Sequence, residues 1–140
     1  MKQDVQAYQT ASTLGDTQLE LIIKVYNGVM IALDTATEAF SKNQGLEARE
    51  QLAKAEKGVA HLFTTLDFEQ GGEIAHSLGQ LYVFAINRIQ SASSSGQTAP
   101  ISEARRVLDN LRTAWTELRG THSVTARVVE PSAVAVNFAG

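Results

Sequence analysis

The residues of this chain that could perform metal or acid–base chemistry are few, and they gather near its middle. Glu73 and His76 have the spacing Glu-x-x-His on an expected helix, which is the spacing that di-iron helical bundles use. Such a site needs the motif twice, with further glutamates on facing helices, but here the motif occurs once and His61 has no glutamate three residues before it. We therefore expect His76 to lie on a partly exposed helix surface and to bind no metal.

Other candidate motifs also lack the partners that catalysis needs. Ser93 is followed by two more serines and a glycine, but this pattern is no nucleophile elbow, and no base stands near it in sequence. The pair Gly71 and Gly72 matches neither phosphate-binding glycine pattern. Asp67 and Glu69 stand at an expected helix junction, where capping and solvation are the usual roles of carboxylates. The sequence therefore predicts no enzyme activity and no cofactor.

Composition narrows the class of protein further. The chain has 140 residues and no cysteine, which favours one domain without disulfides or Cys-based metal sites. Its net charge of −3 argues against a nucleic-acid-binding surface, which is normally basic. No apolar run approaches the roughly 20 residues that cross a bilayer, and the first residues lack the apolar core of a signal peptide. We expect a soluble, cytoplasmic protein that does not insert into membranes.

Hydrophobic periodicity then predicts the elements that carry these residues. Apolar residues recur at steps of three and four in four segments, which predicts an all-α, antiparallel four-helix bundle over residues 17–119. The first helix is expected to begin at Asp16 or Thr17, because Thr17 and Glu20 have capping-box spacing, and to end by Gly45. The second helix is expected over residues 46–66, the third from about Gly72 to a serine-rich linker, and the fourth from about Thr98 to Gly120.

Residues 1–16 are read as a flexible arm and residues 120–140 as a tail of unassigned role. In the tail, Val134 and Val136 alternate with other residues in a weak strand-like pattern that Pro131 interrupts. Two interpretations stay open. The tail is either disordered or loosely attached, or it adds onto an apolar groove of its own or another copy.

The first and third helices carry more apolar residues than one core-facing stripe needs. A second row lies beside the main one, and it either widens the core or lines an exposed groove that binds a partner. From the residues alone, these alternatives are equal for the following positions: Leu21, Val25, Ala75, Tyr82 and Ile86. A homo-oligomer interface is the rival use of such rows, and a weak homodimer stays open.

Several motifs in order resemble the family of flagellar secretion chaperones (FliS). Residues 66–82 read LDFEQGGEIAHSLGQLY, which is similar to the hallmark of that family. Residues 19–28 read LELIIKVYNG, and residues 111–115 read LRTAW, which resemble motifs of its first and last helices. An arm with a tyrosine, Tyr8, precedes them. The sequence departs from the family pattern where Thr17-Gln18 replaces Ser-Pro, and where Val-Phe-Ala follows Tyr82 in place of x-Tyr-Met.

The resemblance implies a cytoplasmic helical bundle that binds the disordered C-terminal segment of flagellin. Such a chaperone prevents premature polymerisation and delivers flagellin to the gate of the flagellar type III export apparatus. The resemblance also implies that Tyr8 lies over the groove when no client is bound, and it favours the groove interpretation for Tyr82 and its neighbours. The expected client-binding residues are Leu21, Ile22, Val25, Leu62, Leu66, Ala75, Leu78, Tyr82 and Ile86.

Overall fold

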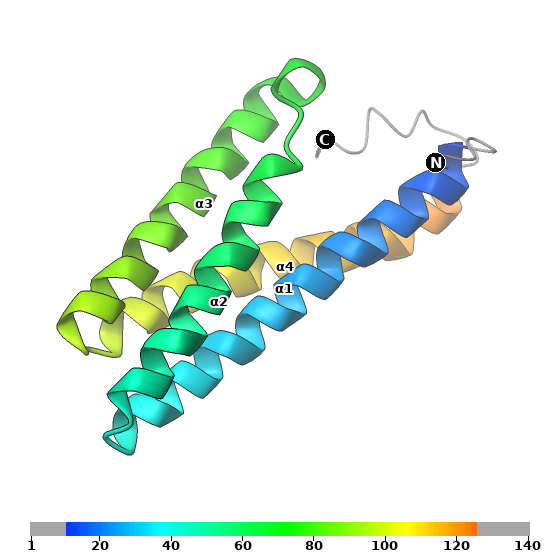
Figure 1. The fold of residues 1–140 in the computed structure, drawn as a ribbon. Coiled ribbons are helices and arrows are strands. Elements are labelled where there is room, and N and C mark those ends of the chain that lie inside the picture. Colours follow the sequence, from blue (N-terminus) through cyan, green and yellow to red (C-terminus); the bar gives the residue numbers. More distant parts are fainter. Residues whose placement is uncertain (1–10, 126–140) are drawn as a thin grey trace.

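The computed structural model describes the backbone of residues 11–125 and the side chains of residues 17–120. Within that part, the chain forms four helices and no strand: α1 (Ala11–Ser41), α2 (Gly45–Thr64), α3 (Phe68–Ser95) and α4 (Ala99–Thr125). Consecutive helices run in opposite directions, and α1 and α4 also lie against each other (Figure 1). The predicted all-α four-helix bundle is confirmed.

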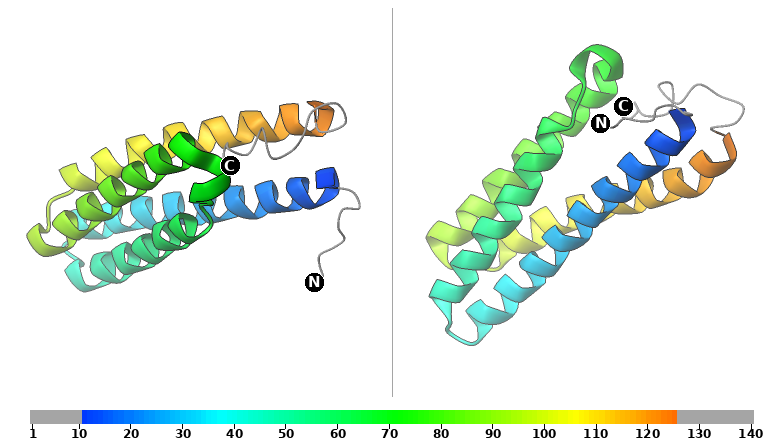
Figure 2. Two further views of the ribbon diagram at one scale, coloured as in Figure 1. Left: turned by 90° about the horizontal axis from the view of Figure 1, so that it is seen from above. Right: turned by 45° about the vertical axis from the view of Figure 1, so that its right-hand side comes forward.

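The α2–α3 hairpin and the pair of helices α1 and α4 diverge toward one end of the bundle. At the end where α1 finishes and α2 begins, all four helices lie together. Toward the end where α1 begins and α4 finishes, the α2–α3 hairpin separates from the α1–α4 pair, as Figure 1 and the right-hand view of Figure 2 show. No helix in the described part of the chain is long and apolar enough to cross a membrane.

Two helices run past the boundaries expected from the sequence. The helix α1 begins at Ala11, inside the predicted arm, so Thr17 lies within the helix and is not its cap. Likewise, α4 continues through Gly120 to Thr125. A glycine inside a helix costs only about 1 kcal/mol, and continuing the helix keeps its backbone hydrogen bonds, so one glycine does not end it. Tyr8 and residues 126–140 lie outside the described residues.

The connection between α2 and α3 is shorter than the sequence suggested. Asp67 is the N-cap of α3, and its side chain accepts hydrogen bonds from the backbone N–H groups of Glu69 and Gln70, each at 3.1 Å. The predicted capping role of Asp67 is therefore confirmed, but α3 begins before the glycine pair. Gly72 instead forms a kink inside the helix, with φ of 53°, a region that glycine enters at little cost.

A ladder of polar contacts sets the register of α1 against α4. Arg119 contacts Glu20 and Arg112 contacts Asn27, while Arg105 binds both carboxylate oxygens of Asp34 at 2.6 and 3.1 Å. Every step of seven residues along α1 is matched by seven residues back along α4. Seven residues make almost two helical turns, so the contacts recur on one seam, as in a coiled coil.

Candidate binding surfaces

A pocket between α1 and α2 is a concavity that could receive an apolar ligand. Its volume is about 380 Å³, and it opens to solvent. We call it the α1–α2 groove, and it is lined by Val25, Gly28, Val29, Ile31, Ala32, Gln51, Lys54 and Gly58. These side chains come together because α1 and α2 pack antiparallel and because α2 carries a glycine, Gly58, where it meets α1.

The two glycines have different roles in the groove. A Cβ on Gly58 would lie only 2.5 Å from Cγ2 of Val29, so this glycine lets α2 approach α1 closely. A Cβ on Gly28 would meet nothing within 4 Å. Gly28 is thus not required by packing within the described chain, although glycine in a helix interior costs about 1 kcal/mol relative to alanine. The position therefore leaves room for something that approaches from outside.

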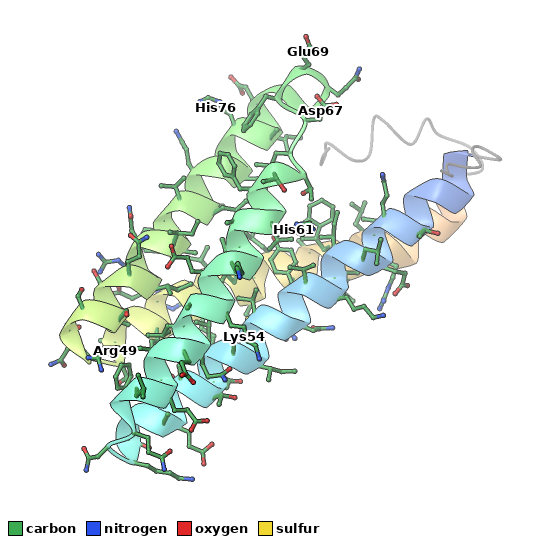
Figure 3. The ribbon with its side chains drawn as sticks, in the orientation of Figure 1. Arg49, Lys54, His61, Asp67, Glu69 and His76 are labelled. Atoms are coloured by element: carbon green, nitrogen blue, oxygen red, sulfur yellow. The ribbon has the colours of Figure 1, made fainter. Side chains whose placement is uncertain are left out.

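The rim of the groove combines exposed apolar surface with two polar side chains. Ile31 is 67% exposed, which is far more than a core residue of α1 shows. Leu21 is 57% exposed and precedes Val25 by one helical turn, so it extends the same face of α1. On α2, Gln51 and Lys54 stand opposite, and Figure 3 shows Lys54 where α2 passes α1. The groove can therefore bind the apolar side chains of a peptide and still offer hydrogen bonds to the backbone of that peptide.

A second apolar surface lies on α3. Ile74, Leu81 and Phe84 are exposed by 53%, 37% and 41%, and their spacing places them along one side of the helix. We call these three residues the α3 row. Of the two neighbouring apolar rows that the sequence shows on this helix, neither lies wholly in the core, because Ile74 and Leu81 are exposed. The core stripe of α3 contains Ala75, Leu78, Tyr82, Ala85 and Ile89.

The nine residues expected to bind a client fall into three groups in the structure. Leu21 is exposed, and Val25 is half-buried in the α1–α2 groove. Three others are half-buried against the core, namely Ile22, Leu66 and Ile86. The remaining four are buried, namely Leu62, Ala75, Leu78 and Tyr82. At these four positions the structure corresponds to the core alternative and not to an open groove. Whether any of the nine contacts a client stays a prediction.

Tyr82 is buried because it belongs to a polar network inside the bundle. Its hydroxyl lies 2.6 Å from the hydroxyl of Tyr26 on α1, and Nε1 of Trp115 on α4 donates a hydrogen bond of 3.1 Å to Tyr26. Burial is the main cause that raises the pKa of both tyrosines above the ordinary value of 10. Both phenols are therefore neutral around physiological pH, and the network joins three helices without burying a charge.

The carboxylates and histidines that the sequence offered as candidates for catalysis or metal binding do not converge in the structure. Figure 3 shows Asp67, Glu69 and His76 around the α2–α3 connection, whereas His61 lies on α2 away from them. The ring of His76 packs edge-on against Phe68, with centroids 6.2 Å apart, and its side chain is exposed. Among the described residues, no three His, Asp or Glu side chains are grouped so that they could hold a metal ion.

Several residues that form these surfaces were not predicted from the sequence. The expected client-binding residues include neither Gly28, which appears only at the end of the motif at residues 19–28, nor Ile31. Gln51, Lys54 and Gly58 were not predicted to line a pocket, because their position depends on how α2 lies against α1. The available signal was Gly28, a glycine in the interior of a helix between the apolar residues Val25 and Ala32 on the same face.

Comparison with known proteins assigns the chain to a family. A family model described as Flagellar protein FliS matches residues 1–122. The flagellar secretion chaperone FliS of Campylobacter jejuni is 31% identical over 106 residues, which are 75% of this chain and 82% of that protein. That of Vibrio cholerae is 26% identical over 136 residues, with 92% and 98% covered. That of Salmonella typhimurium is 31% identical over 100 residues, with 71% and 74% covered.

These matches confirm the resemblance inferred from the motifs. The matched part includes the glycine-containing connection at residues 66–82 and all residues of the α1–α2 groove. It ends before residues 126–140. The chain therefore belongs to the FliS family, which is a family of chaperones and not of enzymes.

Proposed function

We propose that this protein is a cytosolic export chaperone that binds the disordered C-terminal segment of flagellin. The observation that carries the proposal is the α1–α2 groove, with exposed Ile31 on its rim and unfilled space over Gly28. Relatives that match most of this chain are named flagellar secretion chaperones. Binding keeps flagellin from polymerising before export and presents it to the flagellar type III export apparatus.

The physical basis of the proposed binding is coupled folding of the client. A disordered segment with apolar side chains at helical spacing orders itself when it buries them in a groove on a folded bundle. Burial of one large aliphatic side chain contributes about 1.5–3 kcal/mol, and ordering the client offsets part of this gain. A shallow, open groove therefore suits a chaperone, because the client must leave it again at the export apparatus.

The direct test measures how a flagellin C-terminal peptide binds to matched variants by isothermal titration calorimetry. Ile31→Gln removes an exposed apolar group from the groove and keeps a good helix former. We expect binding to weaken about 5- to 30-fold, which corresponds to roughly 1–2 kcal/mol of lost burial.

Leu46→Gln is the matched control for this experiment. Leu46 is 77% exposed on α2 and does not line the groove, so the same kind of substitution should leave the affinity unchanged. Equal weakening in both variants would mean that general surface hydrophobicity, and not the α1–α2 groove, binds the client. No binding by the unmodified protein would exclude flagellin as the client of this chain.

A homo-oligomer is the second candidate, and the α3 row is the observation that favours it. Ile74, Leu81 and Phe84 form an exposed apolar line on a convex helix surface, which is where two copies of a helix can pair. Light scattering with and without the flagellin peptide separates the two functions. A dimer that ignores the peptide would support assembly, whereas a monomer that binds it would support the chaperone.

A further inference from the structure

We propose that residues 132–138 at the C-terminal end of this chain occupy its own α1–α2 groove when no client is bound. This inference rests on the proposed function only in taking the groove to be the site where a client binds. The contact between the segment and the groove itself needs no client. These residues follow α4 and lie outside the described residues. They also lie beyond residue 122, where the match to the family model ends.

The composition of the segment fits an apolar groove. From Pro131 to Gly140 the chain has no charged side chain, whereas the folded part is rich in charge on its surface. Val134, Val136 and Phe138 alternate with small or polar residues. In an extended chain, such alternate side chains lie on one face, about 6.7 Å apart. The three apolar side chains therefore span about 13 Å, close to the roughly 15 Å between Leu21 and Ile31 along α1.

The register of the bundle shows that the segment can reach the groove. Arg119 lies opposite Glu20, so the end of α4 at Thr125 is level with about residue 14 of α1. Gly58 meets Val29, so Lys54 lies about one turn farther along α1. At about 1.5 Å per helical residue, Lys54 is about 28 Å along the bundle from Thr125. The twelve residues from Thr125 to Asn137 span up to about 40 Å, which also covers the sideways distance past α1.

The polar groups of the groove suit an extended occupant. An extended segment on a helical surface keeps backbone N–H and C=O groups that the helices cannot pair, because helix backbones are already bonded. Gln51 and Lys54 stand on the rim, and within the described part of the chain neither side chain takes part in a hydrogen bond or an ion pair. These side chains can bind carbonyl groups of the segment, and in any extended chain the side chain of residue 137 lies on the opposite face from those of residues 136 and 138.

Cysteine cross-linking tests the contact in the absence of any client. The chain has no native cysteine, so a Lys54→Cys, Asn137→Cys variant contains a single pair. We expect a disulfide within one molecule under mild oxidation, at a yield that does not depend on protein concentration. The matched control is Arg106→Cys with Asn137→Cys. Arg106 is exposed on α4 at the same distance of about 28 Å from Thr125, but it does not line the groove.

The disulfide yields of the two cysteine pairs show whether the segment occupies the groove. Occupation of the groove is supported if the Lys54 pair cross-links at least several times more than the Arg106 pair, and if Val134→Gln with Phe138→Gln abolishes the difference. Equal yields for the two pairs would overturn it, because they would show an unattached tail. A disulfide between two molecules would also overturn it, because the segment would then occupy another copy.

Client affinity supplies an independent measurement. Removal of residues 132–140 frees the groove, so the flagellin peptide should bind about two- to tenfold more tightly, by the fraction of molecules whose groove was closed. An unchanged dissociation constant would contradict occupation of the groove. If the peptide binds neither form, the proposed function fails, while the cross-linking result still stands on its own.

Discussion

At the scale of single residues, Gly28 is the position that most clearly separates stability from function. It lies on an exposed part of α1, and a side chain there would meet nothing within 4 Å. Because glycine costs about 1 kcal/mol in a helix interior, the folded bundle alone would be more stable with another residue at this place. The close approach of a bound segment would explain why a glycine stands at this position.

Gly28→Ala should therefore stabilise the protein by about 0.5–1 kcal/mol. Gly28→Leu should also fold, since the space above residue 28 is open. Its leucine side chain should fill the groove, however, and weaken the binding of the flagellin peptide by at least tenfold. Urea denaturation measures the first effect and calorimetry the second. If Gly28→Leu binds the peptide as well as the unmodified protein, the client does not lie over this part of α1.

The pair Tyr26 and Tyr82 gives a prediction for stability and for its dependence on pH. Tyr26→Phe should cost more than Tyr82→Phe, because the Tyr26 hydroxyl lies at the centre of the network, 2.6 Å from the Tyr82 hydroxyl and 3.1 Å from Nε1 of Trp115, which donates to it. We expect about 1–3 kcal/mol for Tyr26→Phe and about 0.5–1.5 kcal/mol for Tyr82→Phe from urea denaturation. Loss of peptide binding without any loss of stability in Tyr82→Phe would show that its hydroxyl is not a core group.

The pH dependence follows from the raised pKa of both tyrosines in the folded state. Below the unfolded value of about 10, both states hold the proton and the tyrosine contribution to stability is fully present. As pH rises from there toward the higher folded-state pKa, the unfolded chain loses protons first, so stability falls. The double variant Tyr26→Phe, Tyr82→Phe should therefore lose less stability between pH 9 and 11 than the unmodified protein. Parallel curves would contradict the assignment.

At the scale of elements, the α1–α4 ladder fixes register more than it adds stability. Asp34 and Arg105 are both partly exposed, so their pair should contribute at most about 1 kcal/mol. A double-mutant cycle with Asp34→Asn and Arg105→Gln should give a coupling of about 0.3–1 kcal/mol. This coupling should shrink at 1 M salt, where the screening length is only about 3 Å. A coupling that salt does not change would mean that packing, and not charge, joins the two side chains.

The helices differ in how well the sequence predicted them, for physical reasons. Four regular apolar patterns indicated four helices, because each pattern is longer than ten residues. The start of α1 was misplaced because a capping-box spacing at Thr17 and Glu20 also occurs by chance inside a helix. On α3, two neighbouring stripes both fit a helical period. The pairing of Tyr82 with Tyr26 across the bundle decides which one is buried, and no local pattern contains that contact.

At the scale of the whole molecule, the fold divides its apolar surface between two uses. The core where the four helices meet is closed by the tyrosine network, while the α1–α2 groove and the α3 row leave apolar side chains at the surface. The sequence indicated an excess of apolar residues but could not say which row lies outside. That choice depends on how the hairpins pack and diverge, which only the assembled bundle determines (Figure 2).

An NMR titration shows whether the client lies in the α1–α2 groove. Amide signals of the labelled protein are followed while an unlabelled flagellin C-terminal peptide is added. If the client lies in this groove, the largest shifts fall at residues 25–32 of α1 and 51–58 of α2. Shifts confined to the α3 row, with the groove signals unchanged, would contradict it.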